Sequence, residues 1–385
     1  MGIFLLGCGE MGTITGTDLL ETYEGDLAFA DREIGRAQKL AQRYPKRKVK
    51  TFSVDVRDKK ALVKALKDSK ATVLINAVNY YFNLDIMSAC LEAGVDYLDL
   101  GGMFHTTLKQ LGLDRAFKGK DLVAIPGMGS SPGITNALAS YAAEGMERVK
   151  TIDVSFADKD YTAYKTPIVL PYTILTLFEE FGYKPVIFKD GKYEQLEPLS
   201  GEVDKRFPRP LGSARCFFTL HSEAATLPTS FKGVENCWFR GSFDPGLVDK
   251  IRFLMAIGFE SREEVRLADG KTVIPRDVIV KMTEKFIPSS DVKIDDTEFL
   301  RVEVEGMQNG KSKKVVAYCQ SFTNKKWNIA AGSWDTGVAP SVVAQMIADG
   351  KVKVRGVVPP ELAFKAEELF SGLEKRNMKI WLDKP

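Results

Sequence analysis

The glycine-rich segment Gly7-Cys8-Gly9-Glu10-Met11-Gly12 is the part of the sequence whose residue types and spacing suggest chemistry most directly. It follows a short apolar run, and a buried strand that leads through G-x-G-x-x-G into a helix is typical of a dinucleotide-binding βαβ unit. The first glycine makes the tight turn, the second admits the pyrophosphate, and the third lets the helix pack on the strand. Backbone amides at the helix start favour the phosphate charge. We therefore expect a cofactor to contact Gly7, Gly9, Glu10, Met11 and Gly12.

A carboxylate follows the second apolar run, because the segment from Asp26 to Ala30 leads directly into Asp31. An acid at this place can accept hydrogen bonds from the ribose hydroxyls and would repel a 2′-phosphate, which favours NAD as the cofactor. The neighbouring Arg32 keeps NADP open, since a guanidinium can hold that phosphate.

Two further pairs of residues follow strands of the same series. Asp55 and Val56 come after the run 48–54, and we expect them beside the adenine. Asn76 and Ala77 close the run 71–77, and ligands of doubly wound sheets bind beyond the carboxyl ends of the strands. We expect the backbone of this pair near the pyrophosphate or the nicotinamide ribose. The alternative for Asn76 is a turn residue that caps the strand end.

Short apolar runs and helical patterns alternate up to about residue 125. Further strands are expected over residues 95–100 and 122–126, and amphipathic helices over residues 57–67 and 83–93, the latter ending at Gly94. Strands that alternate with helices of this length predict an α/β fold with a Rossmann-type, doubly wound parallel sheet.

The pattern changes in the middle of the chain. Longer and more polar strands are expected over 151–156, 216–220, 250–258 and 300–305, with hairpin turns at 189–192 and 269–271. They predict an inserted α+β domain for substrate binding and dimerisation over residues 126–335. A helical pattern from Pro340, ended by Gly350, is expected to pack back on the first domain. The cofactor domain would then consist of residues 1–125 and 336–385.

The composition excludes several function classes. The chain has 385 residues, of which 44% are hydrophobic and 27% charged, and its net charge of +3 comes from 54 basic and 51 acidic residues. This balance gives no sign of a nucleic-acid partner, and we interpret Lys46-Arg47-Lys48 as a surface turn. The five cysteines and two histidines show neither a disulfide framework nor a metal-site spacing. No apolar run is long enough to cross a bilayer, and we expect a cytoplasmic protein.

Ordered landmarks along the chain resemble the saccharopine dehydrogenase family, including its lysine 6-dehydrogenases. They lie in the segments 76–83, 95–102, 127–136, 221–228 and 355–360. The resemblance implies a homodimer that uses a nicotinamide cofactor, NAD or NADP, to oxidise a C–N bond of an amino acid or to reduce an imine. Ser131 stands where saccharopine reductases carry an acid before Pro-Gly. That departure favours the lysine 6-dehydrogenases, which also lack the acid there.

Oxidation of an amine requires a C–H bond facing the nicotinamide and a base that takes a proton as the iminium forms. His221 has a suitable pKa for that transfer, and Glu223 can bind the amine. Tyr80 aligns with a substrate-site tyrosine of saccharopine reductases, and Tyr81 follows it. Asp99 can hold a substrate ammonium or, alternatively, bond the backbone of its own glycine turn.

The segment 129–136 is expected to receive the cofactor or an anionic substrate group at a helix start, with Ser131, Pro132 and Asn136 as substrate-binding residues. A hinge between domains is a compatible alternative. Arg215 and Arg240 are candidates for binding the substrate α-carboxylate through two parallel bonds, although surface pairing is the more common role of an arginine.

The leading hypothesis is an NAD(P)-dependent amino-acid dehydrogenase of the lysine 6-dehydrogenase or saccharopine dehydrogenase type. Two alternatives stay open at this point. One is an opine-like imine reductase that joins an amino acid to a keto acid. The other is a dinucleotide-binding sensor or assembly protein without catalysis.

Overall fold

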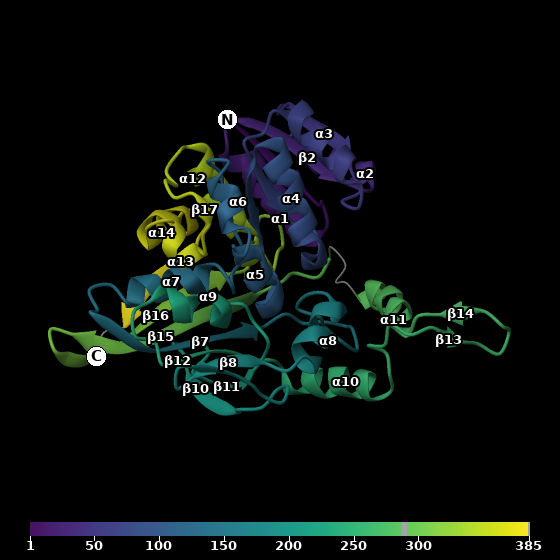
Figure 1. Ribbon diagram of the computed structural model, residues 1–385. Coiled ribbons are helices and arrows are strands. Elements are labelled where there is room, and N and C mark those ends of the chain that lie inside the picture. The colour runs from purple at the N-terminus through teal and green to yellow at the C-terminus, as the bar shows by residue number, and fades with distance from the viewer. Residues whose placement is uncertain (287–290, 384–385) are drawn as a thin grey trace.

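The computed structural model describes residues 1–286 and 291–383 and arranges them around two large β-sheets (Figure 1). Within those residues the first sheet has seven strands in the order β17-β6-β5-β4-β1-β2-β3, and every neighbouring pair is parallel. Its strands are β1 (Gly2–Leu6), β2 (Asp26–Asp31), β3 (Val49–Ser53), β4 (Val73–Asn76), β5 (Asp96–Asp99), β6 (Val123–Ile125) and β17 (Gly356–Val357).

Helices cover both faces of this sheet, which confirms the predicted doubly wound α/β fold. The strand order reverses between β1 and β4, and ligands bind at such a switch point. The helices of this part are α1 (Glu10–Thr22), α2 (Ile34–Ala41), α3 (Lys59–Ser69), α4 (Asn83–Ala93), α5 (Met103–Leu111) and α6 (Asp114–Lys118), with the short turn η1 (Tyr80–Phe82) before α4.

The second sheet is mixed, as the sequence predicts for the middle of the chain. Its main path runs β10-β11-β12-β7-β15-β16-β18, and only β12 and β7 pair in parallel. Its strands are β7 (Arg148–Asp160), β8 (Val186–Lys189), β9 (Lys192–Gln195), β10 (Val203–Arg206), β11 (Ser213–Phe218), β12 (Asn236–Gly241), β15 (Asp296–Gln308), β16 (Lys311–Phe322) and β18 (Lys379–Asp383).

The remaining helices pack between the sheets or extend to one side. Figure 1 shows α11 and the small hairpin of β13 and β14 projecting away from both sheets, while α10 packs on α8. The bounds are α7 (Ile134–Ala142), α8 (Ile174–Gly182), α9 (Glu223–Ser230), α10 (Pro245–Ala256), β13 (Val265–Arg266), β14 (Thr272–Val273), α11 (Pro275–Thr283), η2 (Glu284–Phe286), α12 (Ala331–Ala348), α13 (Pro360–Ala363) and α14 (Ala366–Glu374).

Several local predictions are confirmed and others are wrong. The hairpin turns at 189–192 and 269–271 are present, and α4 ends at Gly94, whose φ of 74° suits a glycine. The strand predicted over 250–258 is wrong, because these residues lie mostly in α10. Asp244 caps that helix by accepting from the amide of Leu247, and Pro245 occupies its first turn.

The C-terminal segment returns to the first sheet and then leaves it. The helix expected from Pro340 begins nine residues earlier, at Ala331, and packs along α1. β17 then pairs with β6 in the first sheet, whereas β18 pairs with β16 in the second. The final residues therefore tie the two sheets together rather than completing the first one.

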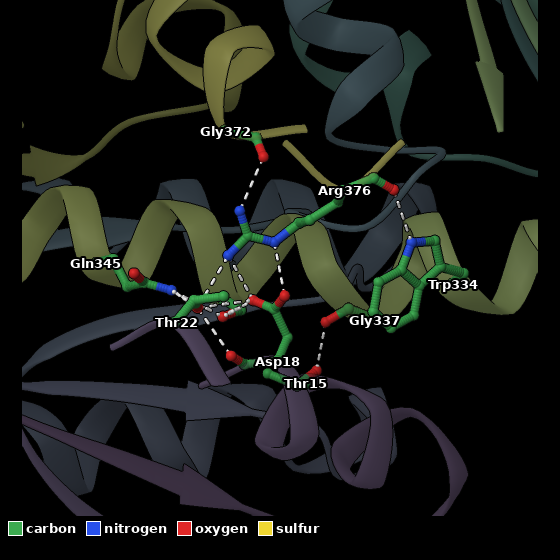
Figure 2. Close-up of polar contacts among 9 residues, drawn as sticks. Thr15, Asp18, Thr22, Trp334, Gly337, Gln345, Gly372 and Arg376 are labelled. Atoms are coloured by element: carbon green, nitrogen blue, oxygen red, sulfur yellow. Dashed lines mark hydrogen bonds and ion pairs between the residues drawn. The ribbon is translucent and has the colours of Figure 1, made fainter. Parts of the chain in front are cut away.

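A buried ion pair fixes α1, the helix that follows the glycine turn, to this C-terminal segment (Figure 2). Arg376 donates from Nε and Nη2 to the two carboxylate oxygens of Asp18, at 2.7 and 2.6 Å, and Ser341 on α12 donates to the same carboxylate at 2.6 Å. Thr15 donates to the carbonyl of Gly337. Since Asp18 is 2% exposed, the orientation of α1 depends on this pair.

Among the described residues, no helix is long and apolar enough to span a membrane.

Candidate active site

A pocket of about 330 Å³ opens beside the glycine turn, where the carboxyl ends of the first three strands meet. Among its lining residues are Gly7, Asp31, Arg32, Asp55 and Val56, five positions that the sequence predicts as cofactor contacts. The residues that the sequence did not single out are Leu6, Glu33, Arg36, Val54, Arg57, Val78 and Phe82.

The glycine turn has the geometry that a dinucleotide requires. Gly7 has a φ of 92°, and a Cβ on Gly12 would lie 1.8 Å from the Gly7 carbonyl oxygen, so the turn and the helix cannot hold side chains there. A Cβ on Gly9 would meet no atom within 4 Å, which leaves open space where the pyrophosphate approaches. The free amides of Glu10 and Met11 begin α1 beside that space. These residues fit a bound dinucleotide.

Asp31 ends β2 and accepts two backbone hydrogen bonds, from Cys8 at 2.7 Å and from Glu33 at 2.8 Å. Its carboxylate thus ties the glycine turn to the strand and still has lone pairs for a ribose. The side chain of Arg32 is exposed on the same pocket. Arg57 bonds Asp55, and these hydrogen bonds are the main cause that lowers the pKa of the Asp55 carboxyl.

Replacing Asp31 by Ala is expected to shift the preference from NAD toward NADP by about tenfold or more, because the change removes a charged ribose acceptor and a charge that repels a 2′-phosphate. Titration calorimetry with both cofactors measures the ratio. Asp26→Ala, at the exposed opposite end of β2, is the matched control. An unchanged ratio in the Asp31 variant would show that this carboxylate is not the ribose ligand.

The side chain of Asn76 takes the role of a turn residue. Its Oδ1 accepts from the amide of Val78 at 3.0 Å, and its Nδ2 donates to Asn83 and to the hydroxyl of Tyr97. Ala77 lies next to the glycine turn, since a Cβ on Gly7 would come within 2.9 Å of its carbonyl. The backbone of Asn76 and Ala77 thus borders the glycine turn. The side-chain amide of Asn76, in contrast, is engaged in hydrogen bonds with other residues of the protein.

The role predicted for Asp99 needs correction, because its carboxylate is 1% exposed and fully engaged by the protein. It accepts from the backbone amides of Gly101 and Gly127, both at 2.8 Å, and from Gln110 at 2.6 Å. Asp99 therefore joins the ends of β5 and β6 and holds the following loop, and no surface is left for a substrate ammonium.

The loop 127–136 leaves the end of β6 and enters α7 beneath the second sheet. Pro132 precedes the N-cap Gly133 of this helix and packs against Gly101 and Gly127. Asn136 is 1% exposed, accepts from the amide of Gly133 and donates to Glu361, so it supports the helix start rather than a substrate.

Ser131 differs from its neighbours in the same loop. Its Oγ is buried and has no hydrogen-bond partner among the described residues. The Oγ of Ser222 lies 3.9 Å from a Cβ placed on Gly127. It is also buried and has no hydrogen-bond partner within the described part of the chain. Ser131 thus remains a candidate for substrate binding.

His221 lies between two buried carboxylates next to this loop. Its Nδ1 is 3.1 Å from Oε2 of Glu223 and its Nε2 is 3.6 Å from Oε1 of Glu180, while its ring stacks on Phe239 with centroids 3.6 Å apart. Burial opposes the charged imidazolium, but the two carboxylates outweigh it and raise the pKa of His221 to about 9. The imidazole therefore holds a proton at neutral pH.

The chain folds so that three segments meet at His221. Glu223 begins α9 with a fully buried side chain and accepts from Thr135 in the first turn of α7 at 2.9 Å. Glu180 belongs to α8 and accepts from the hydroxyl of Tyr172. Sequence analysis found His221 and Glu223 but missed Glu180, whose acidic pair with Glu179 in an apolar helix was the available signal.

Tyr80 and Tyr81 reach from η1 to α8 on the second domain. Tyr80 donates to Glu179 at 3.2 Å, and Tyr81 donates to the same carboxylate, which Arg276 also binds at 2.7 Å. Burial and the nearby Glu179 raise the pKa of Tyr80 above its usual range, so its hydroxyl keeps its proton. Tyr80 thereby contacts Glu179, the residue that precedes Glu180 in α8.

The two arginines predicted to bind a carboxylate lie elsewhere. Arg240 follows Phe239 in β12, so it points to the opposite face of the sheet, where it stacks on Phe218 with its guanidinium carbon 3.9 Å from the ring centroid. Arg215 is largely exposed and pairs with Glu202 and Asp204. Both arginines therefore pair with carboxylates of the protein, Arg215 at the surface and Arg240 with Asp153 at 3.6 Å, in line with the alternative of surface or interface pairing.

The comparisons with known proteins agree with this geometry. The chain matches the Saccharopine dehydrogenase NADP binding domain over residues 3–125 and the Saccharopine dehydrogenase C-terminal domain over residues 129–378. It is 24% identical to a carboxyaminopropylagmatine dehydrogenase of Synechocystis over 95% of this chain and 92% of that protein. It is 23% identical to a carboxynorspermidine synthase of Vibrio alginolyticus over 93% of this chain and 91% of the relative.

Two solved structures share the fold over the whole chain. The apo form of saccharopine dehydrogenase (L-Glu forming) from Saccharomyces cerevisiae superimposes with a TM-score of 0.77 at 14% identity, covering 100% of this chain and 99% of that one. The homospermidine synthase of Legionella pneumophila in complex with NAD gives 0.71 at 15% identity, covering 100% and 91%. Since the two family matches together span both sheets, the chain belongs to the saccharopine dehydrogenase family of NAD(P)-dependent oxidoreductases.

Proposed function

We propose that the protein uses NAD(P) to form, or in reverse to oxidise, a secondary amine that joins an amino-acid carbon chain to a diamine or polyamine. The names of two relatives, carboxyaminopropylagmatine dehydrogenase and carboxynorspermidine synthase, both describe a multi-amine compound that carries a carboxyl group. The observation that carries the proposal is the protonated His221 held between Glu180 and Glu223 beside the loop 127–136. This arrangement suits proton transfer at a nitrogen in an acidic surrounding.

The residues of this chain would act on the proton and on the orientation of the amine. A bound nicotinamide supplies or accepts the hydride. When an aldehyde and a primary amine condense, water leaves and an imine forms, and the imidazolium of His221 donates the proton that this step and the reduction require. Glu223 and Glu180 stabilise the imidazolium and orient its ring, and Tyr80 positions α8 through Glu179.

In the opposite direction the same group takes a proton. Neutral His221 would accept it from the substrate ammonium, which leaves the free amine whose C–H bond is oxidised. Buried carboxylates near the reacting nitrogen stabilise positive charge on the substrate, and this holds for a polyamine and for the side chain of lysine alike. An enzyme of the lysine 6-dehydrogenase or saccharopine dehydrogenase type would therefore use the same mechanism as one that acts on polyamines, and only the substrate would differ.

A two-direction assay separates these substrates. In the reductive direction, NADPH or NADH is mixed with an amino-acid semialdehyde and either 1,3-diaminopropane or agmatine, and the absorbance of the reduced cofactor should fall while a coupled product appears by mass spectrometry. In the oxidative direction, L-lysine and saccharopine are tested with NAD and NADP. Turnover with lysine or saccharopine alone would replace the polyamine proposal. Tight cofactor binding with no turnover across the panel would favour a catalytically silent sensor.

A further inference from the structure

A second set of acidic residues lies on two neighbouring strands of the second sheet and on the helix packed against them. Asp158 on β7 pairs directly with Glu298 on β15, and Glu298 pairs with Ser321 on β16. Directly opposite residues share one face of a sheet, and like charges in that arrangement repel each other. Partial burial, and after it the charges of Asp296 and Asp160, together raise the pKa of Asp158 to about 6. This arrangement costs stability, so it calls for a reason other than folding.

Asp335 on α12 adds a third carboxyl group behind Glu298. Its Oδ2 accepts from Ser321 at 2.7 Å, but its Oδ1 has no donor among the described residues, although Asp335 is fully buried. The carboxyl of Glu298 lies within hydrogen-bond range of it. Because two ionised carboxylates cannot bond each other, this pair needs either a shared proton or a cation beside it.

Neighbouring acids are already explained by structural roles, whereas Asp158 and Glu298 are not. Asp296 accepts from the amide of Ala331 at the start of α12, and Asp160 accepts from Tyr164. Within residues 1–286 and 291–383, neither Asp158 nor Glu298 forms an ion pair with a basic side chain. The same residues contain no group of three or more His, Cys, Asp or Glu side chains suited to a metal ion. The missing cation is therefore better supplied by an ammonium.

The acidic set is connected to the loop 127–136 and to Glu180 by contacts of α12 and Tyr172. Thr336 follows Asp335 and donates to Ser130 in the loop 127–136 at 3.0 Å. The pKa of Tyr172, which bonds Glu180, is raised first by burial and then by Glu180 and Glu298, so this tyrosine lies between the two acidic groups. Although their carboxyl groups are surrounded by protein, both Asp158 and Glu298 keep solvent-accessible surface, through which a ligand can reach them.

We propose that Asp158 and Glu298, with Asp335 behind them, bind the distal ammonium of a diamine or polyamine whose other nitrogen reacts beside His221. The inference rests on the proposed function and names the substrate feature that selects a multi-amine over a monoamine. We call these three residues the distal acidic subsite. Along β7, Asp158 lies four residues from Val154, which pairs with Phe239 under His221, a span of about 13 Å. The subsite is thus within one extended amine chain of the imidazole.

The test uses Asp158→Asn and Glu298→Gln, with Glu305→Gln as control, since Glu305 lies on the same strand away from the subsite. Titration calorimetry with 1,3-diaminopropane, putrescine and spermidine measures binding to the cofactor-loaded protein. For the best-bound amine, both variants should lose about 10- to 100-fold in affinity, while the control retains it. Thermal midpoints should stay equal or rise, because each substitution removes a repulsive charge.

Steady-state kinetics supplies the second readout. In the reductive assay, Glu298→Gln should raise the KM for spermidine, whose extended chain is long enough to reach from the imidazole toward the subsite, with little change in kcat, while the KM for n-propylamine, which has no second ammonium, stays as in the unmodified protein. Wild-type protein that binds none of the three amines, or variants that bind them equally well, would overturn the subsite. Variants that lose amine binding in a protein without any turnover would keep the subsite and defeat the proposed reaction. Turnover with an unchanged KM in both variants would support the proposed reaction and overturn the subsite.

Discussion

Replacement of His221 by Ala is expected to lower kcat by about 10²- to 10⁴-fold, the usual contribution of a positioned acid or base. The imidazole is held by contacts with Glu223, Glu180 and the ring of Phe239, and an alanine at this position carries no group that can transfer a proton. The KM for the cofactor should change little, because His221 does not line the pocket beside the glycine turn. Stopped-flow absorbance of the reduced cofactor gives the rate of the hydride step directly.

The pH profile distinguishes proton transfer from a structural role. The pKa of His221 is raised to about 9, so the imidazolium persists at neutral pH and is lost as the pH rises through that value. The rate of amine formation, which needs the proton, should fall above about pH 9, and the rate of amine oxidation, which needs the neutral ring, should rise through the same range. Both limbs should vanish in His221→Ala.

Two variants complete this test. Glu223→Gln keeps the shape of the buried side chain but removes a charge that raises the pKa of His221. The pH at which the rates of amine formation and oxidation change should therefore be lower in this variant. His105→Ala is the matched control, because His105 is exposed on α5 and outside the cluster. Full activity and an unchanged profile in His221→Ala would remove this residue from the mechanism and leave Tyr80 as the remaining candidate.

Local signals in the sequence predict the first sheet well because each strand and helix carries its own boundary residues. Gly94 ends α4 at the predicted position, and the spacing of Gly7, Gly9 and Gly12 identifies both the strand and the helix start. Longer-range packing overrides such signals in one helix. α12 contains Gly332, Gly337 and Pro340, which argue against a helix. Gly337 is retained because a Cβ there would lie 2.5 Å from Ile14 on α1.

The candidate site is only partly visible in the sequence, for a topological reason. His221 and Glu223 are two residues apart and could be recognised together. Glu180 comes from α8 and joins them only after the chain has folded. Asp158, Glu298 and Asp335 meet through the pairing of β7 with β15 and the docking of α12, with no motif at any of the three. Asp99 is visible in the sequence as an acid before two glycines, but its carboxylate accepts hydrogen bonds from the backbone of its own turn and of the neighbouring loop.

Replacement of Arg376 by Ala is expected to lower the free energy of unfolding by about 3–5 kcal/mol, because it leaves the carboxylate of Asp18 buried without its cation. Asp18 is 2% exposed, and Arg376 is its bidentate partner at 2.7 and 2.6 Å (Figure 2). The side chain of Arg376 also donates to the carbonyl of Gly372, so its loss frees that acceptor as well. Denaturant unfolding followed by circular dichroism measures the change.

Arg355→Ala provides the control, since Arg355 pairs with Asp121 at the surface and such pairs contribute about 0–1 kcal/mol. The double variant Asp18→Asn with Arg376→Met should recover part of the loss, because it removes the unpaired charge and not only its partner. The Arg376 variant should also bind NAD(P) more weakly, because α1 carries the glycine turn at one end and the ion pair holds it against α12 and α14. If Arg376→Ala unfolded at the same denaturant concentration as Arg355→Ala, the pair would not anchor α1, and the cofactor turn would have to be fixed by other contacts of α1 with α12, such as the packing of Gly337 on Ile14 and the hydrogen bond from Thr15 to the Gly337 carbonyl.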